Sequence, residues 1–410
     1  MKELLKSDKK NITAIVIVAA LGYFVDVYDL ILFSVVRKPS LLSLGVSGDE
    51  QINIGVMLLN WQMAGMLIGG ILWGILGDKK GRISVLFGSI FLYSAANIAN
   101  GFVQDVHTYS VLRFIAGLGL AGELGAGITL VSEIMPKESR GWGTTIVATI
   151  GLTGAVVAAL VANKFEWRVS YFVGGVLGLA LLILRVSVYE SGMYKNIKDR
   201  NISKGNFLKL FTDKERFYKF SKCILIGLPT WFVIGVLVTF SDKFAEAFGI
   251  TEPVNPAQSI MYAYIGIVAG DFISGYLSQI FKTRKKVVLL FLFMNVICIT
   301  VYLFFNHYGN VFFYFMCGML GFSNGYWAVF VTNASEQFGT NFRATVTTAV
   351  PNIIRGTTVP MTLSFQFFRE HTGIVNGAVI VAFIALSIAI TAALRTKETF
   401  GKDLDYVEVT

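Results

Sequence analysis

Two carboxylates three residues apart stand inside an apolar stretch, GYFVDVYDLILF, at residues 22–33. In a helix, Asp26 and Asp29 would share one face, because residues three apart are neighbours there. An ionisable side chain near the centre of a bilayer costs at least about 2.5 kcal/mol, so each needs a partner or a function. Two ionised carboxylates this close also repel each other, which favours a proton on one of them. The pair is therefore a candidate proton-carrying site.

Arg113 and Glu123 lie deep within the apolar stretch at 108–134. Arg113 lies about as deep as Asp29, counted from the ends of their stretches at about 1.5 Å per residue. We expect these two side chains to meet, either as a proton-coupling pair or as a static pair that fixes helix packing. Glu123 lies roughly 15 Å deeper than Arg113. It is a second candidate proton carrier, with a helix-packing glutamate as the alternative.

Arg355 falls near the middle of the apolar stretch at 343–368, between Asn352 and Gly356. A guanidinium group can bind a carboxylate or a phosphate through two parallel hydrogen bonds. The position of Arg355 therefore predicts a binding site for an anion. The alternative is that Arg355 neutralises Asp271, the only acidic residue in the stretch at 257–281. The two roles do not exclude each other.

Aromatic and amide side chains in other apolar stretches could complete a binding cavity. A single aromatic residue is more often a packing residue than a ligand contact, since the chain has 34 Phe. The candidate binding residues beside Arg355 and Asp271 are Tyr28, Gln62, Trp231, Tyr326, Trp327 and Asn352, with Tyr23 and Asn60 as further possibilities.

Residues that hold metals or act as nucleophiles are sparse. The three cysteines, Cys223, Cys298 and Cys317, stand apart in apolar surroundings, without a CxxC pair or a cluster of histidines. A phosphate-binding GKS or GKT loop is missing as well, which argues against ATP as an energy source. We expect no metal, no cofactor and no catalytic residue, so the chain is not expected to be an enzyme.

The elements that must position these residues are long apolar stretches. Hydrophobic residues make up 54% of the 410 residues and charged residues 15%, which is typical of an integral membrane protein. Its partner is then the lipid bilayer, and a nucleic acid is not expected. We predict an all-α fold with twelve transmembrane helices, at 12–36, 51–77, 83–102, 108–134, 141–163, 168–188, 220–247, 257–281, 286–305, 309–337, 343–368 and 372–394.

Basic residues predict how the chain is oriented. With an even number of spans both termini lie on one side, and that side would hold 27 of the 35 Lys and Arg. The opposite loops would hold six of them: Arg37, Lys38, Lys164, Arg168, Lys243 and Arg369. Because cytoplasmic loops carry the excess of basic residues, both termini are predicted to be cytoplasmic.

The chain divides into two similar halves. The longest polar connection, 189–219, separates spans six and seven, and SEIMPKESR at 132–140 recurs in outline as SEQFGTNFR at 335–343. These features predict two pseudo-symmetric six-helix bundles, at 1–188 and 220–394, joined by a cytoplasmic linker at 189–219 and followed by a cytoplasmic tail at 395–410. Duplicated halves in one membrane chain are typical of an alternating-access carrier.

A loop between spans two and three carries a family resemblance. GILGDKKGR at 74–82 resembles the signature loop of the major facilitator superfamily, through Gly74, Asp78, Lys79, Gly81 and Arg82. Its glycines permit close helix contact, and its basic residues hold the loop on the cytoplasmic side. A glycine-rich helix followed by an ordinary basic loop is the alternative.

Three other stretches are similar to the metabolite:proton symporter branch of that superfamily. They are RFIAGLGLAGELGAG at 113–127, the acidic-x-aromatic-Asp pattern at 26–29, and the Glu-x-Phe-x4-Arg pattern from Glu336 to Arg343. The 26–29 pattern also resembles the phosphate:proton symporters. Those symporters carry Asp-Tyr-Pro where this chain has Glu123-Leu124-Gly125, and an acidic residue in span seven where it reads WFVIG at 231–235. Inorganic phosphate is therefore disfavoured.

The resemblance implies a secondary transporter that imports a small organic anion with protons by alternating access. Arg355 would bind the anion, Asp29 and Glu123 would carry protons, and Arg113 would be the counter-charge that protonation releases. At cytoplasmic helix ends, two carboxylate–guanidinium pairs would gate or pack the helices: Glu133 with Arg140, and Glu336 with Arg343.

Other functions stay open at this point. The substrate could be neutral or zwitterionic, such as a sugar or an amino acid, or it could be phosphate or a phosphorylated metabolite. A membrane receptor or scaffold that transports nothing is a different class, which the charged residues inside the spans argue against. We expect a monomer in a bacterial plasma (inner) membrane.

Overall fold

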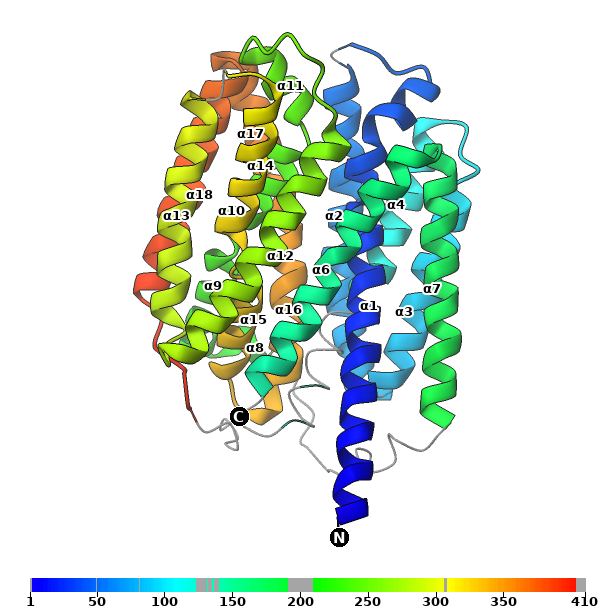
Figure 1. Ribbon diagram of the computed structural model, residues 1–410, viewed down its shortest axis with the longest axis vertical. Coiled ribbons are helices and arrows are strands. Elements are labelled where there is room, and N and C mark those ends of the chain that lie inside the picture. The colour runs from blue at the N-terminus through cyan, green and yellow to red at the C-terminus, as the bar shows by residue number, and fades with distance from the viewer. Residues whose placement is uncertain are drawn as a thin grey trace.

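The computed structural model is a tall bundle of helices (Figure 1). The part of the chain that it describes has helices and connections without a β-strand. Eight helices in that part are each long and apolar enough to cross a membrane. The described residues are 2–48, 50–80, 82–122, 131, 135, 140–190, 209–305 and 308–402.

The first half of the chain contributes six spans. α1 packs along α6, α2 along α4, and α3 against both α4 and α7. Glycines allow these close contacts, since a Cβ atom at Gly65 would lie 2.2 Å from the carbonyl oxygen of Phe114, and one at Gly117 would lie 2.1 Å from that of Gln62. The helices are α1 (Lys2–Ser43), α2 (Glu50–Lys80), α3 (Arg82–Asn100), α4 (Val106–Leu120), α6 (Arg140–Lys164) and α7 (Trp167–Glu190).

The second half also contributes six spans, and three of them are interrupted. Span seven consists of α9 (Lys214–Ile226), α10 (Leu228–Phe232), a π-helical turn η2 (Val233–Val238) and α11 (Ser241–Ala247). Spans ten and eleven are split as well, and a short helix, α8 (Lys209–Thr212), precedes the half. The remaining helices are α12 (Pro256–Ile280), α13 (Lys285–Phe304), α14 (Asn310–Asn324), α15 (Trp327–Glu336), α16 (Thr340–Gly356), α17 (Thr358–Thr372) and α18 (Ile374–Leu394).

The predicted fold of twelve spans is confirmed, with the fourth span, 108–134, described continuously to residue 122. The predicted continuity of spans seven, ten and eleven is wrong. Prolines account for two interruptions, because a proline has no N–H to donate and its ring clashes with the carbonyl four residues earlier. Pro229 follows the break at Gly227, and Pro360 follows the break after Gly356. The third break, at Gly325, lies where a close helix crossing leaves no room for a side chain.

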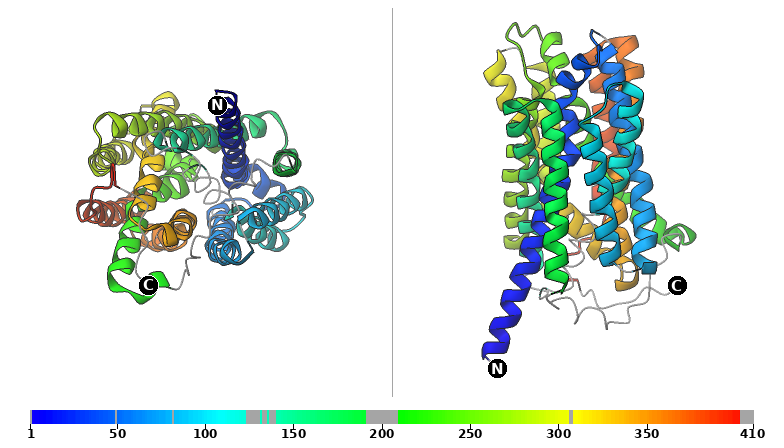
Figure 2. Two further views of the ribbon diagram at one scale, coloured as in Figure 1. Left: turned by 90° about the horizontal axis from the view of Figure 1, so that it is seen from below. Right: turned by 90° about the vertical axis from the view of Figure 1, so that its right-hand side faces the viewer.

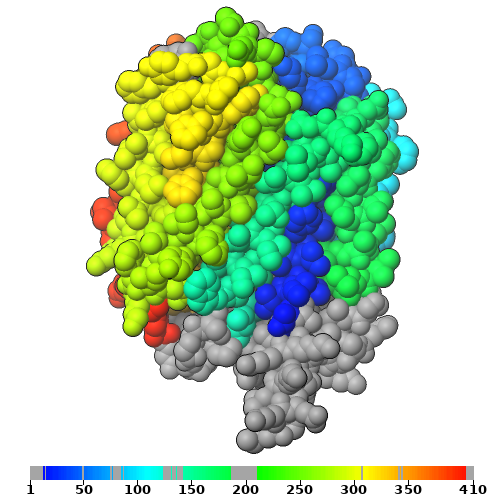
Figure 3. Space-filling model, in the orientation of Figure 1, coloured from blue at the N-terminus to red at the C-terminus, as the bar shows by residue number. Residues whose placement is uncertain are grey.

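Both halves stand side by side with their helices upright (Figures 1 and 2). They meet through α6 with α12 and through α2 with α16, and Figure 3 shows α6 and α12 adjoining on one surface. We call the end where α1 begins and α18 ends the termini face, and the end that carries α11 the distal face. The domain limits predicted at 188, 220 and 394 stay a prediction, since residues 191–208 lie outside the described part.

Two spans form the centre of the molecule. In each of Ile15–Ser43 and Lys214–Val238, 78% of the most apolar 18-residue segment is buried. The corresponding share for Trp167–Arg185 in α7 is 39%. α1 and the seventh span are therefore surrounded by protein, whereas α7 lies at the periphery. Side chains on α1 are accordingly placed to act between the halves.

Candidate functional site

An ion pair joins the two halves in the middle of the bundle. Arg355 Nη2 on α16 lies 3.4 Å from Asp26 Oδ2 on α1, and their side chains are 1% and 0% exposed. Arg355 Nη1 donates to Asn352 Oδ1 at 3.3 Å, and Asn352 Nδ2 donates to the carbonyl oxygens of Ala121 at 2.7 Å and Thr348 at 2.9 Å. The predicted anion-binding arginine is thus held at the contact between α1, α4 and α16.

The alternative partner for Arg355, Asp271, has a different role. Between these two described residues there is no ion pair; Asp271 Oδ1 instead accepts the backbone N–H of Ala328 at 2.7 Å. The crossing of α12 and α14 explains this choice. A Cβ atom at Gly325 would lie 2.5 Å from the backbone N of Asp271, so the start of α15 comes directly against Asp271. The carboxylate therefore caps the half-helix α15 near its positive end, and the alternative in which Arg355 pairs with Asp271 is not the arrangement in this structure.

Aromatic residues surround the Asp26–Arg355 pair. Tyr23 interacts electrostatically with Arg355, Asp26 and Asp271, and the Trp327 indole lies beside it without meeting the geometry of a hydrogen bond. Tyr264 on α12 interacts with Tyr23, Arg355 and Asp26. The sequence prediction missed Tyr264, although it precedes Asp271 by seven residues and so falls on the same helix face.

Two indole groups near the helix breaks are buried and have no hydrogen-bond partner. Trp231 in α10 and Trp327 at the start of α15 are each 5% exposed, and neither Nε1 atom donates a hydrogen bond. The chain segments before them touch, since Thr230 Oγ1 donates to the Tyr326 hydroxyl at 3.5 Å. A buried donor normally has a partner, so both indoles can donate to a ligand.

Three predicted binding residues bond to the backbone of neighbouring helices instead. Tyr28 donates its hydroxyl to the carbonyl oxygen of Ser170 at 3.0 Å, Gln62 Nε2 donates to that of Leu30 at 3.0 Å, and Tyr326 donates to that of Ile226 at 3.0 Å. These bonds hold helices within each half. The structure therefore gives them a packing contact and does not bring them to Arg355.

Asp29 and Arg113 lie close enough to interact electrostatically, as expected, but these two described side chains form no ion pair. Both side chains are fully buried in the first half, and neither the Asp29 carboxylate nor the Arg113 guanidinium makes a hydrogen bond. The guanidinium carbon lies 5.7 Å from the centre of the Phe33 ring and 5.4 Å from that of Tyr171, so cation–π contacts take the place of the ion pair. Asp29 faces Gly174, where an added Cβ atom would lie 2.2 Å from Asp29 Oδ1.

A second ion pair between the halves lies at the distal face. Arg37 Nη2 lies 2.7 Å from Asp242 Oδ1, and their side chains are 0% and 3% exposed. The sequence prediction placed Arg37 in an outer loop, but α1 continues to Ser43 and buries it. A carboxylate inside the apolar stretch 220–247 was the signal that could have identified Asp242.

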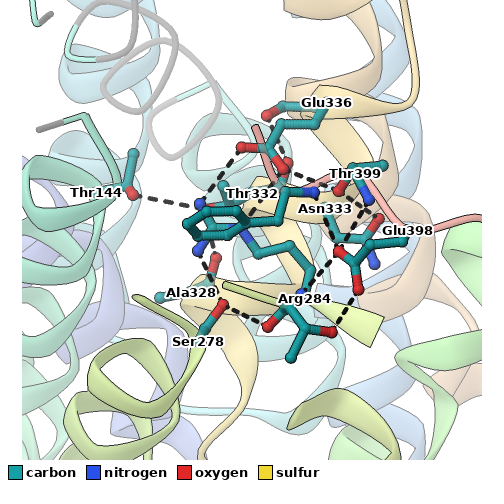
Figure 4. A network of polar contacts seen from close by, with 12 residues as sticks. Thr144, Ser278, Arg284, Ala328, Thr332, Asn333, Glu336, Glu398 and Thr399 are labelled. Atoms are coloured by element: carbon teal, nitrogen blue, oxygen red, sulfur yellow. Dashed lines mark hydrogen bonds and ion pairs between the residues drawn. The ribbon is translucent and has the colours of Figure 1, made fainter. Parts of the chain in front are cut away.

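A polar network lies at the termini face (Figure 4). Arg284 Nη2 lies 3.4 Å from Glu336 Oε1, and Thr399 Oγ1 donates to Glu336 Oε2 at 2.8 Å. Glu398 accepts the backbone N–H of Arg284 at 2.8 Å and the hydroxyl of Thr283. The start of the predicted tail therefore packs under the second half and caps α13.

Several predicted residues cannot be placed. Glu123, Glu133 and Gly81 lie outside the described residues. For six further residues the structure describes the backbone alone: Gly74, Asp78, Lys79, Arg82, Arg140 and Arg343. The predicted gating pairs therefore stay predictions, and Arg284 and Thr399 are the described partners of Glu336.

Comparison with known proteins agrees with this architecture. The niacin transporter NiaP of Acinetobacter baylyi is 26% identical over 380 residues, which cover 84% of this chain and 85% of the relative. The cis,cis-muconate transport protein of the same organism is 26% identical over 401 residues, 93% of each chain. The solved structure of the proton:xylose symporter XylE superposes with a TM-score of 0.71 over 97% of this chain and 98% of its own, at 14% identity, which shows a shared fold.

The family assignment rests on a match along most of the chain. The sequence profile described as Major Facilitator Superfamily matches residues 19–355, a range that includes Asp26 in α1 and Arg355 in α16. This range spans both halves and the central ion pair. The chain is therefore a multi-pass membrane transporter that belongs to the major facilitator superfamily.

Proposed function

We propose that this transporter carries a small organic anion together with protons, by alternating access of a central site. The observation that carries the proposal is the buried Arg355 at the contact between the halves. Its guanidinium has five N–H donors, and its Nε atom has no hydrogen-bond partner. A carboxylate that reached this group would gain two parallel, charge-assisted hydrogen bonds.

The balance of charge around Arg355 supports proton coupling. Asp26 and Asp271 are both fully buried, and Arg355 is the one cation among the described groups that interact with Tyr23. With both carboxylates ionised, this region has a net charge of about −1, which the positive end of α15 partly offsets at Asp271. An arriving anion would add a further unpaired charge in a buried place. A proton that enters with the anion removes that penalty.

The aromatic residues near Arg355 support flat, unsaturated carboxylates as substrates. Tyr23 and Tyr264 interact electrostatically with Arg355, and Trp327 lies beside Tyr23. Aromatic rings pack well on flat π systems. By their names, the two bacterial relatives carry niacin and cis,cis-muconate, which are small unsaturated carboxylates. We infer a substrate of that kind for this chain.

The distribution of basic residues supports an orientation in a bacterial plasma membrane. The termini side of the predicted topology holds 27 of the 35 Lys and Arg, so the termini face would be cytoplasmic and the distal face would lie outside. The Arg37–Asp242 pair would then close the outer end of the path in the state described here. Import follows if the inward proton gradient drives the cycle.

Transport into proteoliposomes tests the proposal. We expect nicotinate or benzoate to accumulate when the lumen is more alkaline than the medium, and an uncoupler to abolish this accumulation. Nicotinamide, which has the same ring as nicotinate without the charge, should not accumulate. The proposal is wrong if nicotinamide is carried and the carboxylates are not, or if carboxylate accumulation ignores the proton gradient.

Variants of two arginines complete the test. Arg355→Ala should lower carboxylate uptake by about tenfold or more, since a charge-assisted bond contributes about 1.5–3 kcal/mol. Arg395→Ala is the matched control, because Arg395 is exposed after the last span, and it should transport like the wild type. Equal uptake by the two variants would show that Arg355 does not bind the substrate.

A further inference from the structure

We propose that Asp26 and the substrate carboxylate bind Arg355 in turn, and that Asp26 takes up the coupled proton as it releases the guanidinium. This inference rests on the proposed function, because it assumes that the substrate is a carboxylate. It names the residue that couples the proton to the substrate. Asp29, which the family resemblance implies for that task, is not that residue.

The edge of the guanidinium that would bind a carboxylate is shared with Asp26. A side-on bidentate contact uses the Nε and Nη2 atoms together. In this structure Nη2 donates to Asp26 Oδ2, and Nε has no partner. A substrate carboxylate that takes this edge must therefore displace Asp26. Asn352 binds the other amino group, Nη1, and can stay in place.

The length of the Asp26–Arg355 contact favours replacement of Asp26 by another carboxylate. Its N···O distance is 3.4 Å, whereas charge-assisted pairs commonly lie at about 2.7–2.9 Å. The distal pair in the same protein, Arg37–Asp242, lies at 2.7 Å. A long contact leaves less interaction energy to replace when the substrate arrives, so the central pair can open while the distal pair holds.

Arg355 is the basic residue that the structure pairs with Asp26. The described stretches of α2 and α6 near this level bring no charged side chain. If the substrate takes Arg355 while Asp26 stays ionised, two carboxylates face one guanidinium in a buried site, which is unfavourable. A proton on Asp26 removes the excess charge. The described titratable and charged groups that interact with Asp26 are Tyr23, Asp29, Tyr264 and Arg355. Asp271 interacts with Tyr23, and Arg113 with Asp29.

The position of Asp26 also links the proton to movement of the halves. Asp26 belongs to α1 in the first half and Arg355 to α16 in the second, so their pair is a contact between halves. Protonation of Asp26 would break that contact. Asp29 faces Gly174 in α7, inside the first half, and makes no ion pair with the second half. Asp29 is therefore not itself a partner in the contact between the halves.

Binding and transport by paired variants test the inference. In the wild type, nicotinate affinity in detergent should fall by about tenfold per pH unit at alkaline pH, as expected when one proton binds with the ligand. Asp26→Asn should bind nicotinate with an affinity that does not change with pH. In proteoliposomes it should still exchange labelled for unlabelled nicotinate but should not accumulate it along a proton gradient. Glu246→Gln, at an exposed carboxylate paired with Lys243, is the control and should keep both the pH dependence and accumulation. Asp29→Asn is the competing variant: if it loses the pH dependence while Asp26→Asn keeps it, the inference is overturned.

A measurement on the unmodified protein guards against a variant that fails to fold. In weakly buffered solution at alkaline pH, nicotinate binding to the wild type should take up about one proton per site, followed with a pH dye. Binding without proton uptake, or accumulation by folded Asp26→Asn, overturns the inference and leaves the proposed function standing. If the wild type neither binds nor carries any carboxylate, the proposed function itself fails.

Discussion

Arg37 and Asp242 form the shorter of the two ion pairs that join the halves in the described part of the chain, with an N···O distance of 2.7 Å. The same Arg37 Nη2 atom donates to the carbonyl oxygen of Thr239 at 3.2 Å, and the guanidinium carbon lies 4.7 Å from the centre of the Phe240 ring. Ser34 accepts a hydrogen bond from Thr239 at 3.2 Å, just below the pair. These contacts bring the outer parts of α1 and span seven together, so they are expected to close the distal face.

The first prediction concerns this closure. Asp242→Asn should weaken the contact by about 3–5 kcal/mol, because it leaves the buried Arg37 without its counter-charge. A cysteine in place of Ser34, which is 3% exposed, reports access from the distal face in a protein whose three native cysteines are replaced. A membrane-impermeant thiol reagent should label it at least about tenfold faster with Asp242→Asn.

Lys243→Gln provides the control for that experiment. Lys243 is next to Asp242 but pairs with the exposed Glu246, and exposed pairs contribute little. Labelling at position 34 should therefore stay slow in this variant. If Asp242→Asn labels no faster than Lys243→Gln, the ion pair does not close the distal face.

The second prediction concerns Asp271 as a helix cap. Asp271→Ala removes the acceptor for the Ala328 N–H and should lower the free energy of unfolding by about 1–2 kcal/mol. Asp271→Asn keeps an oxygen at that place and should lose much less. Thermal unfolding in detergent, followed by tryptophan fluorescence, compares the two variants. Equal losses would mean that the charge of Asp271 matters and the cap does not.

The third prediction concerns the segment after the last span. Burial raises the pKa of Glu398, but the Thr283 hydroxyl and the backbone N–H groups of Arg284, Phe400 and Thr399 hydrogen-bond to the carboxylate and lower that pKa below its ordinary value of 4.5. A lowered pKa in the folded state means that ionised Glu398 stabilises the fold above the unfolded pKa. The stabilisation is lost as the pH falls through the folded pKa.

Glu398→Gln should therefore lower the midpoint of thermal unfolding at neutral pH, by a few degrees at most because the group is partly exposed. The difference from the wild type should shrink as the pH falls below about 4.5. Glu215→Gln is the control, since Glu215 forms an exposed pair with Lys219. A difference that is the same at neutral and acidic pH would contradict the role given to the ionised carboxylate.

Hydropathy could predict the spans because each apolar stretch long enough to cross a bilayer encodes one helix. It also found Arg355 and Asp26, since charged residues in such stretches are rare. Their pairing was not predictable, because which carboxylate meets a guanidinium depends on how the halves dock. Asp271 is the example. It accepts a hydrogen bond from Ala328 because glycines let α12 and α14 cross closely, and hydropathy does not describe that crossing.

The ends of helices were predicted less well than their centres. Arg37 was assigned to a loop because the apolar stretch ends near it, yet α1 continues through Pro39 to Ser43. The partner that permits this burial, Asp242, comes from the other half of the chain. A paired arginine can extend a buried helix where a lone one would end it, and a single sequence does not reveal the pair.

The last prediction concerns the crossing that positions Asp271. A Cβ atom at Gly325 would lie 2.5 Å from the backbone N of Asp271 and 2.5 Å from the backbone of Gly270, so Gly325→Ala must push α12 away from the start of α15. Overpacking of this kind costs about 1–3 kcal/mol, and it should also lengthen the bond from Ala328 to Asp271. Gly318→Ala is the control in α14, because its Cβ would lie 3.6 Å from the nearest atom, the carbonyl oxygen of Tyr262. Thermal unfolding and carboxylate uptake should both fall for Gly325→Ala and stay near wild type for Gly318→Ala. If the two variants behave alike, the close crossing at Gly325 does not position the site.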